Sequence, residues 1–213
     1  MKEKISLVLI PLMVFTILLI YYQREKKFLL PTPVPENYQP AALQQPLDLS
    51  AWTNRKSFNK PLLLHFFNPD CPCSRFNLDH FRQLAEAYGT EAEFVLVWQS
   101  EDAEQQRIQD FLQEEKLTMQ VIADKDKQLA EACGVYATPQ AVIFDKNSRL
   151  IYRGNYNKSR FCTLRSSNYA QQAMEALLYE KPQPNFGPLA LRAYGCSLPG
   201  ATSSFSIFPP NLF

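Results

Sequence analysis

Two cysteines separated by a single proline, Cys71-Pro72-Cys73, are the side chains of this 213-residue sequence best suited to do chemistry. They follow a short apolar run at residues 62–67, typical of a buried strand, and they precede the apolar spacing of a helix. A thiol at the start of a helix faces unpaired backbone N–H groups and the positive end of the helix dipole, which both stabilise a thiolate. The motif therefore predicts a reactive thiolate, with Pro72 at the first helical position.

Two charged neighbours are expected to tune this thiol. Arg75 stabilises a thiolate and lowers the thiol pKa below its usual value of about 8.5, whereas Asp70 opposes that effect. The alternative interpretation is that both cysteines are buried structural residues. A close cysteine pair at a strand-to-helix turn is an unusual choice for packing alone, which favours the reactive interpretation.

A second feature is the dipeptide Thr138-Pro139, which stands just before the apolar segment 141–144. A proline that enters a strand removes a backbone donor from the hydrogen-bond ladder. We expect a cis Thr138–Pro139 bond at the entry of this strand. A trans proline on an edge strand is the alternative.

The elements that position these residues alternate along the chain. Strands alternating with helices predict an α/β fold with a mainly parallel sheet, closed by a hairpin around residues 146–148. Strands are expected at residues 62–67, 94–98, 119–123, 140–145 and 150–153, and helices at 74–88, 103–115, 125–133 and 168–180.

The N-terminal region has a different character. Residues 5–22 form an apolar run flanked by lysines and arginines, which predicts an uncleaved single-pass membrane anchor, or signal-anchor, rather than a cleaved signal peptide. Because flanking charges nearly balance, the cysteine chemistry decides the orientation and favours a domain outside the cytoplasm, on the periplasmic side of a bacterial inner membrane. The expected organisation is an anchor (1–27), a Pro-rich linker (28–47), an α/β domain (48–181) and a C-terminal tail (182–213).

Composition limits the remaining possibilities. Hydrophobic residues make up 46% and charged residues 20%, which is ordinary for a globular protein, and the formal net charge of +1 disfavours nucleic-acid binding. The five cysteines are an odd number, so at least one has no intramolecular disulfide partner. Cys133 lies in a predicted helix and is expected to pack, whereas Cys162 and Cys196 lie in a loop and the tail, where redox use is plausible.

The order of these features resembles the thioredoxin fold over residues 48–197. It is similar to membrane-anchored thiol–disulfide oxidoreductases and to redoxins of the AhpC/TSA-like type, whose sheets are mixed and flanked by helices. The resemblance is carried by the cysteine pair that opens a helix and by Cys133-Gly134-Val135-Tyr136-Ala137-Thr138-Pro139, Tyr152-Arg153-Gly154 and Tyr194-Gly195-Cys196-Ser197.

The resemblance implies roles for individual residues. Cys71 aligns with the nucleophile and Cys73 is expected to resolve the mixed disulfide, although Cys-Pro-Cys replaces the usual Cys-x-x-Cys and Ser74 stands at the usual resolving position. A Cys71–Cys73 disulfide closes a small, strained ring, so Cys162 or Cys196 is the alternative resolving residue. The peroxiredoxin signature is absent, which disfavours peroxide reduction.

Further roles follow from the same resemblance. Thr138 and Pro139 would hold the extended backbone of a substrate. His65 takes the place of a buried acid and could relay protons, unless it is simply a core residue. The implied partners are a protein thiol or disulfide substrate, an upstream reductant or oxidant, and a membrane, but no nucleic acid.

The leading hypothesis is thus a membrane-tethered thiol–disulfide oxidoreductase without a metal or cofactor. Two alternatives are kept. One is a copper-binding, metallochaperone-like protein in which Cys71 and Cys73 are joined by a third ligand, either His65 or a tail cysteine. The other is a non-catalytic thioredoxin-like interaction module.

Overall fold

A computed structural model describes residues 2–36, 38–53, 59–158 and 167–199; the side chains of residues 2–8 and 24–29 are outside this description. The chain divides into two compact units, residues 1–31 and residues 32–213. The first unit contains helix α1 (Lys2–Leu29), and the second contains all the other elements.

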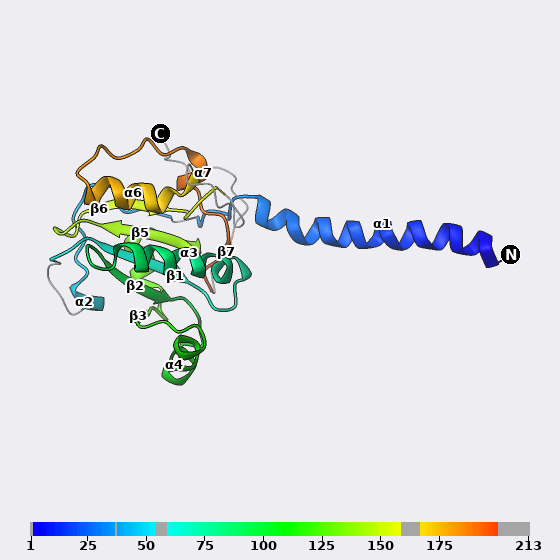
Figure 1. Cartoon of the computed structure of the whole chain (residues 1–213), viewed down its shortest axis with the longest axis horizontal. Coiled ribbons are helices and arrows are strands. Elements are labelled where there is room, and N and C mark those ends of the chain that lie inside the picture. Colours follow the sequence, from blue (N-terminus) through cyan, green and yellow to red (C-terminus); the bar gives the residue numbers. More distant parts are fainter. Residues whose placement is uncertain (1, 37, 54–58, 159–166, 200–213) are drawn as a thin grey trace. The chain divides into compact units, whose positions relative to one another are not determined.

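The second unit is built on a five-stranded mixed sheet (Figure 1). Its strands are β1 (Leu62–Phe67), β2 (Glu93–Trp98), β3 (Gln120–Ala123), β5 (Gln140–Phe144) and β6 (Leu150–Gly154). They lie in the order β3-β2-β1-β5-β6. Strands β1, β2 and β3 are parallel, whereas β5 is antiparallel to both β1 and β6. A separate two-stranded sheet pairs β4 (Ala137–Thr138) antiparallel with β7 (Cys196–Ser197).

Helices cover both faces of the large sheet. They are α2 (Ser50–Thr53), α3 (Pro72–Tyr88), α4 (Gln105–Glu114), α5 (Gln128–Cys133), α6 (Tyr169–Leu178) and α7 (Pro188–Leu191). The main strands and helices end within a few residues of the predicted positions. Helices α3, α4 and α6 pack on one face, and α5 packs on the other.

Alternation along the strands separates two hydrophobic cores. In β1, Leu63 and Phe67 face the core under α3 and α6, whereas Leu62, Leu64 and Phe66 face the core under α5. All six residues of β1 are buried, as expected for a central strand covered by helices on both faces.

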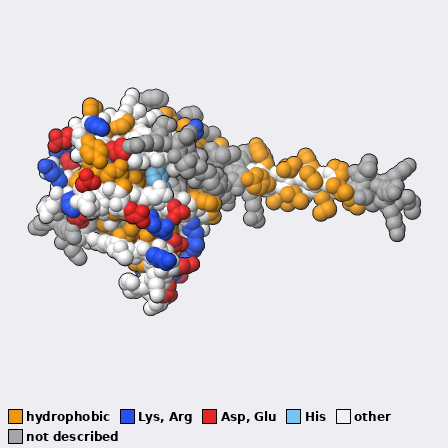
Figure 2. Space-filling model, in the orientation of Figure 1, with side chains coloured by type: hydrophobic (Ala, Val, Ile, Leu, Met, Phe, Trp, Pro, Cys, Tyr) orange, Lys and Arg blue, Asp and Glu red, His pale blue; other side chains and the backbone are white. Residues whose placement is uncertain are grey.

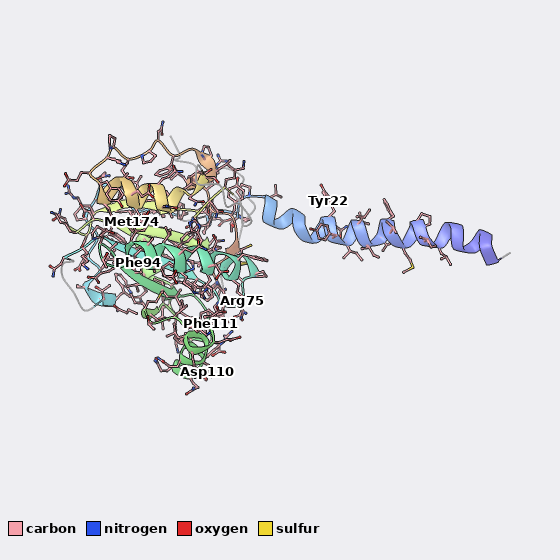
Figure 3. The ribbon with its side chains drawn as sticks, viewed as in Figure 1. Tyr22, Arg75, Phe94, Asp110, Phe111 and Met174 are labelled. Atoms are coloured by element: carbon pink, nitrogen blue, oxygen red, sulfur yellow. A yellow bond between two sulfur atoms is a disulfide. The ribbon has the colours of Figure 1, made fainter. Side chains whose placement is uncertain are left out.

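The edges of the first core are closed by side chains from α4 and α6. Phe111 and Met174 point toward the sheet, while Asp110 points away from it on the exposed side of α4 (Figure 3). The packing of α4 rests on Ile108 and Phe111, the two buried residues along its length, with Leu112 partly buried against the same core.

Helix α1 exposes large apolar side chains between Leu9 and Tyr22, which form a continuous hydrophobic surface along the described part of the helix (Figure 2). Across the residues whose side chains the structure describes, no helix has an apolar stretch long enough to qualify as a membrane span. Residues 5–8 of the predicted anchor lie outside those residues.

Two segments expected to be a spacer and a tail pack on the domain. Thr32 and Val34 are buried, and the Thr32 N–H donates to the Ala193 carbonyl at 2.8 Å. The Tyr38 hydroxyl donates to the Gly134 carbonyl at 2.7 Å. Beyond residue 182, the described part of the tail contains α7 and β7. The domain therefore includes residues on both sides of the predicted 48–181 range.

His65 is a core residue of this fold. Its ring is fully buried in β1, stacks on Phe81 with a centroid distance of 4.5 Å, and its Nδ1 is hydrogen-bonded to the Tyr156 hydroxyl at 2.7 Å. Burial disfavours the charged imidazolium, and the nearby His80 adds to this effect; together they lower the pKa of His65 to about 3. His65 is therefore neutral across the physiological pH range.

This burial predicts a pH-dependent stability. Below about pH 6.5 the unfolded chain takes up a proton at His65, whereas the folded chain does not until about pH 3, so stability falls as pH falls through this window. The slope for one such group approaches about 1.4 kcal/mol per pH unit. Urea unfolding at pH 7, 6 and 5 should show a flatter dependence for His65→Gln than for the wild-type protein. Equal slopes in the two proteins would contradict the prediction.

Candidate functional site

The loop between β1 and α3 presents Cys71 at the start of a long helix. Asn68 fixes the turn with two hydrogen bonds. Its side-chain oxygen accepts from the Asp70 N–H at 2.8 Å, and its backbone carbonyl accepts from the Cys71 N–H at 3.1 Å. Cys71 has extended backbone angles at the N-cap of α3, and Pro72 follows at the first helical position. The Cys71 side chain makes no cap hydrogen bond, and the positive end of the α3 dipole stabilises negative charge on its sulfur.

Cys71 forms a disulfide with Cys196 of β7, 125 residues further along the chain. Their Cα atoms are 6.1 Å apart, within the usual range for a disulfide. Cys73 is buried and stays a thiol. The sulfur atoms of Cys71, Cys73 and Cys196 all lie within 4.8 Å of one another. The structure thus joins Cys71 to the tail cysteine that the sequence offered as an alternative, and not to Cys73.

The predicted cis Thr138–Pro139 bond is present beside this disulfide. The Thr138 carbonyl lies 3.7 Å from the Cys71 sulfur, and Thr138 pairs with Cys196 in the β4–β7 ladder. The dipeptide expected to hold the backbone of a substrate therefore holds an extended segment of the same chain, with a cysteine of that segment bonded to Cys71.

Several contacts keep the tail segment in place. The Leu198 N–H donates to the Tyr136 carbonyl at 3.3 Å, and the Leu198 side chain is buried in the core under α5. The Lys127 Nζ donates to the Pro199 carbonyl at 2.9 Å. On the other side, the Thr32 hydroxyl accepts from the Gly195 N–H and donates to the Gly195 carbonyl, both at 3.1 Å.

Gly195 allows this segment to approach β4 closely. A Cβ at this position would overlap the Thr138 carbonyl oxygen and crowd the Pro139 ring. The observed pairing therefore requires a glycine immediately before Cys196. The reason is the lack of space for a Cβ, since the backbone conformation of Gly195 is one that other residues can also adopt.

The charged residues around Cys71 differ from the expected arrangement. The Arg75 Nε donates to the Pro69 carbonyl at 2.9 Å, and no described contact joins its guanidinium to the Cys71 sulfur. Asp70 is paired instead with Arg107 of α4 at 2.7 Å, and Arg107 also meets Asp102 at 3.0 Å. Arg107 thus offsets the Asp70 charge that opposes a thiolate. These partners are partly exposed, so solvent screens their effect.

The other predicted residues take separate places. His65 contacts Phe81 and Tyr156, and among the described contacts none connects it to Cys71. Cys133 is fully buried in α5, and burial raises the pKa of its thiol, as expected for a packing residue. Cys162 lies outside the described residues.

Sequence reasoning missed Thr32, Lys127 and Leu198, which keep the tail segment in place. It also missed Arg107, which forms an ion pair with Asp70. The available signal was the Gly195-Cys196-Ser197 tripeptide, which marks a cysteine with an unhindered backbone but gives no hint of its partner strand.

The arrangement has the parts needed for thiol–disulfide exchange. A thiolate at Cys71 would be stabilised by the start of α3, a second cysteine is within bonding distance, and a backbone edge at β4 orients an extended cysteine-containing segment.

Solved structures with similar folds support the architecture. An uncharacterized conserved protein from Geobacillus kaustophilus is 22% identical, with a TM-score of 0.60, covering 81% of this chain and 94% of that chain. A hypothetical protein from Sinorhizobium meliloti 1021 is 18% identical, with a TM-score of 0.56, covering 65% and 78%. A thioredoxin-like protein, solved in solution in its oxidized form, is 20% identical, with a TM-score of 0.50, covering 71% and 98%. At these identities the similarity shows a thioredoxin-like fold.

A search among curated proteins finds no match. The model of one family, DUF6436, described as a domain of unknown function, matches residues 40–197, a range that holds Cys71, the Thr138–Pro139 bond and Cys196. The chain belongs to the DUF6436 family.

Proposed function

We propose that this protein is a thiol–disulfide oxidoreductase whose redox pair is Cys71 and Cys196. The observation that carries the proposal is the Cys71–Cys196 disulfide, formed at the start of α3 while β7 is paired with β4. It combines an activated sulfur, a partner cysteine and a strand-binding edge in one place. Cys73 then needs no step in the reaction.

The reaction balances without a cofactor. In the reduced protein the Cys71 thiolate attacks one sulfur of a substrate disulfide, forms a mixed disulfide and expels the other substrate sulfur as a thiolate. The Cys196 thiolate then attacks the Cys71 sulfur and releases the second substrate thiolate. Two electrons pass to the substrate, the two expelled thiolates take up protons, and the Cys71–Cys196 disulfide is formed.

Regeneration begins at the more accessible sulfur. Cys71 is only 1% exposed, whereas Cys196 is partly exposed. A thiolate of an upstream reductant attacks the Cys196 sulfur and expels the Cys71 thiolate, which the start of α3 stabilises. A second thiolate of that reductant then releases Cys196, and two electrons have returned to the protein. With an upstream oxidant, the same steps run in reverse.

The tail occupies the position in which a substrate segment would bind. β7 occupies the edge of β4 with an extended backbone, and its cysteine meets Cys71. A substrate segment that used the same edge would add to β4 as a strand, a common mode of peptide recognition. Substrate and tail therefore compete for β4, and return of the tail brings Cys196 to the mixed disulfide.

We further propose that the N-terminal helix tethers the protein to a membrane and that the domain works outside the cytoplasm, on the periplasmic side of a bacterial inner membrane. The support is the apolar run at residues 5–22 and the exposed apolar side chains between Leu9 and Tyr22. A compartment that favours disulfides suits the Cys71–Cys196 pair.

The first prediction separates the two candidate resolving cysteines. In Cys196→Ser the mixed disulfide at Cys71 has no resolving thiol, so a cysteine-containing model substrate should stay covalently bound, as seen by mass spectrometry of the non-reduced protein. Cys73→Ser should release the substrate and form the Cys71–Cys196 bond. Cys133→Ser, at a buried thiol in α5, is the matched control and should behave as wild type. Trapping by Cys73→Ser alone would assign the resolving role to Cys73, and no exchange by the wild-type protein would favour an interaction module.

The second prediction concerns the approach of β7 to β4. In Gly195→Ala the added methyl group overlaps the Thr138 carbonyl, so the strand pairing and its hydrogen bonds are weakened. Loss of one or two such bonds, worth about 1 kcal/mol each, should make the Cys71–Cys196 disulfide about tenfold easier to reduce. Equilibration with dithiothreitol buffers and thiol trapping measures this change. Gly187→Ala, where an added Cβ meets nothing within 4 Å, should match wild type. An unchanged equilibrium in Gly195→Ala would refute the role of the close approach.

The third prediction concerns the tether. In a bacterial expression host the full chain should remain in the membrane fraction after alkaline carbonate washing and require detergent for release, because the exposed apolar side chains between Leu9 and Tyr22 are stabilised by the lipid interior. A chain that begins at Leu30 should be found in the soluble fraction. Release of the full chain by carbonate alone would contradict an integral tether.

A further inference from the structure

Three cysteine sulfurs meet at the start of α3. Cys71 is the N-cap of the helix, Cys73 lies in its first turn and Cys196 comes from β7, and their sulfur atoms lie within 4.8 Å of one another. A disulfide needs two of these sulfurs. The third, on Cys73, is buried beside the pair and has no step in the exchange reaction.

We propose that the reduced protein binds one cuprous ion through the sulfurs of Cys71, Cys73 and Cys196. A thiolate sulfur lies about 2.3 Å from a bound metal ion of this size, so three sulfurs around one ion in a plane are about 4 Å apart. The three sulfurs already lie within 4.8 Å, and opening of the disulfide lets Cys71 and Cys196 separate to that spacing.

The donor set selects the ion. Thiolates are soft ligands that suit Cu(I). Within the described residues, the cluster contains three cysteines and no histidine or carboxylate, whereas a structural Zn²⁺ site calls for four ligands. Cu(I) is satisfied by three sulfurs. His65, the non-cysteine ligand that the sequence suggested, is bound to Tyr156 in the core and is not part of the cluster.

The charge of the site is compatible with thiolates. Each thiol that binds the ion releases a proton to solvent, so a thiolate-rich site carries net negative charge. The positive end of the α3 dipole favours this negative charge at the start of the helix. Asp70, the acidic residue next to Cys71, is paired with Arg107.

Metal binding and the disulfide exclude each other. The Cys71–Cys196 bond removes two of the three ligands, and a dithiol reductant must supply two electrons and two protons to restore them. The site therefore exists only in the reduced protein. This binding function does not depend on the exchange reaction, because it uses the sulfurs as ligands and transfers no electrons to a substrate.

The test measures copper binding and not activity. The full chain in detergent, reduced and kept anaerobic, is titrated with Cu(I) against the chromophoric chelator bathocuproine disulfonate. Wild type should retain one copper per chain, Cys73→Ser and Cys196→Ser should each bind at least tenfold more weakly, and Cys133→Ser should match wild type. The disulfide form should retain none.

Each other outcome overturns the proposal. No retained copper in reduced wild type excludes the site, and wild-type affinity in Cys196→Ser excludes the tail sulfur as a ligand. Retention of Zn²⁺ but not Cu(I) in the same competition excludes the cuprous assignment. Circular dichroism of the two cysteine variants shows whether they are folded, and the comparison between oxidised and reduced wild type needs no variant at all.

Discussion

The close pairing of β7 with β4 is the interaction on which the site depends. A two-residue strand has little stability of its own, and neighbouring contacts hold β7 in place. Leu198 is buried, the Thr32 hydroxyl is hydrogen-bonded to the backbone N–H and carbonyl of Gly195, and the Lys127 Nζ donates to the Pro199 carbonyl. Thr32 belongs to the segment that enters the domain and Gly195 to the segment that leaves it. The two ends of the domain thus meet at its cysteines, which explains why neither segment is a simple linker.

The two sulfurs of the disulfide have unequal surroundings. Cys71 is buried at the start of a 17-residue helix, where negative charge on sulfur is stabilised, and the Asp70 charge is offset by Arg107. Cys196 is partly exposed on a two-residue strand and does not lie at the start of a helix. A sulfur whose thiolate is stabilised by the start of a helix is the better leaving group, so attack at Cys196 is favoured by both access and chemistry. In the proposed reaction, an incoming thiolate therefore attacks the Cys196 sulfur and not the Cys71 sulfur.

The fold was predictable where sequence patterns are long. The apolar run at residues 62–67 places β1, and the helical spacing after Cys73 places α3, because both depend on the local hydrophobic pattern. Pro139 marks the cis bond because it depends on a local backbone preference. β7 and α7 were not predictable, since elements of two and four residues carry no periodicity and exist through tertiary contacts. Because β7 could not be predicted, the sequence indicated Cys196 only as one of several candidate disulfide partners of Cys71.

The cysteine spacing has a further consequence for the chemistry of the site. In Cys71-Pro72-Cys73 the second cysteine is one residue earlier than in Cys-x-x-Cys, and the usual position holds Ser74, which is fully buried with its hydroxyl bonded to the Asn68 N–H. Ser74 thus supports the turn that presents Cys71, and the partner sulfur must come from elsewhere. The chain supplies it from β7, an extended segment that is paired with β4. In the proposed exchange reaction a substrate segment uses the same edge of β4 as the tail, so it reaches Cys71 only when the tail is displaced, and the stability of the β4–β7 pairing sets how often that happens.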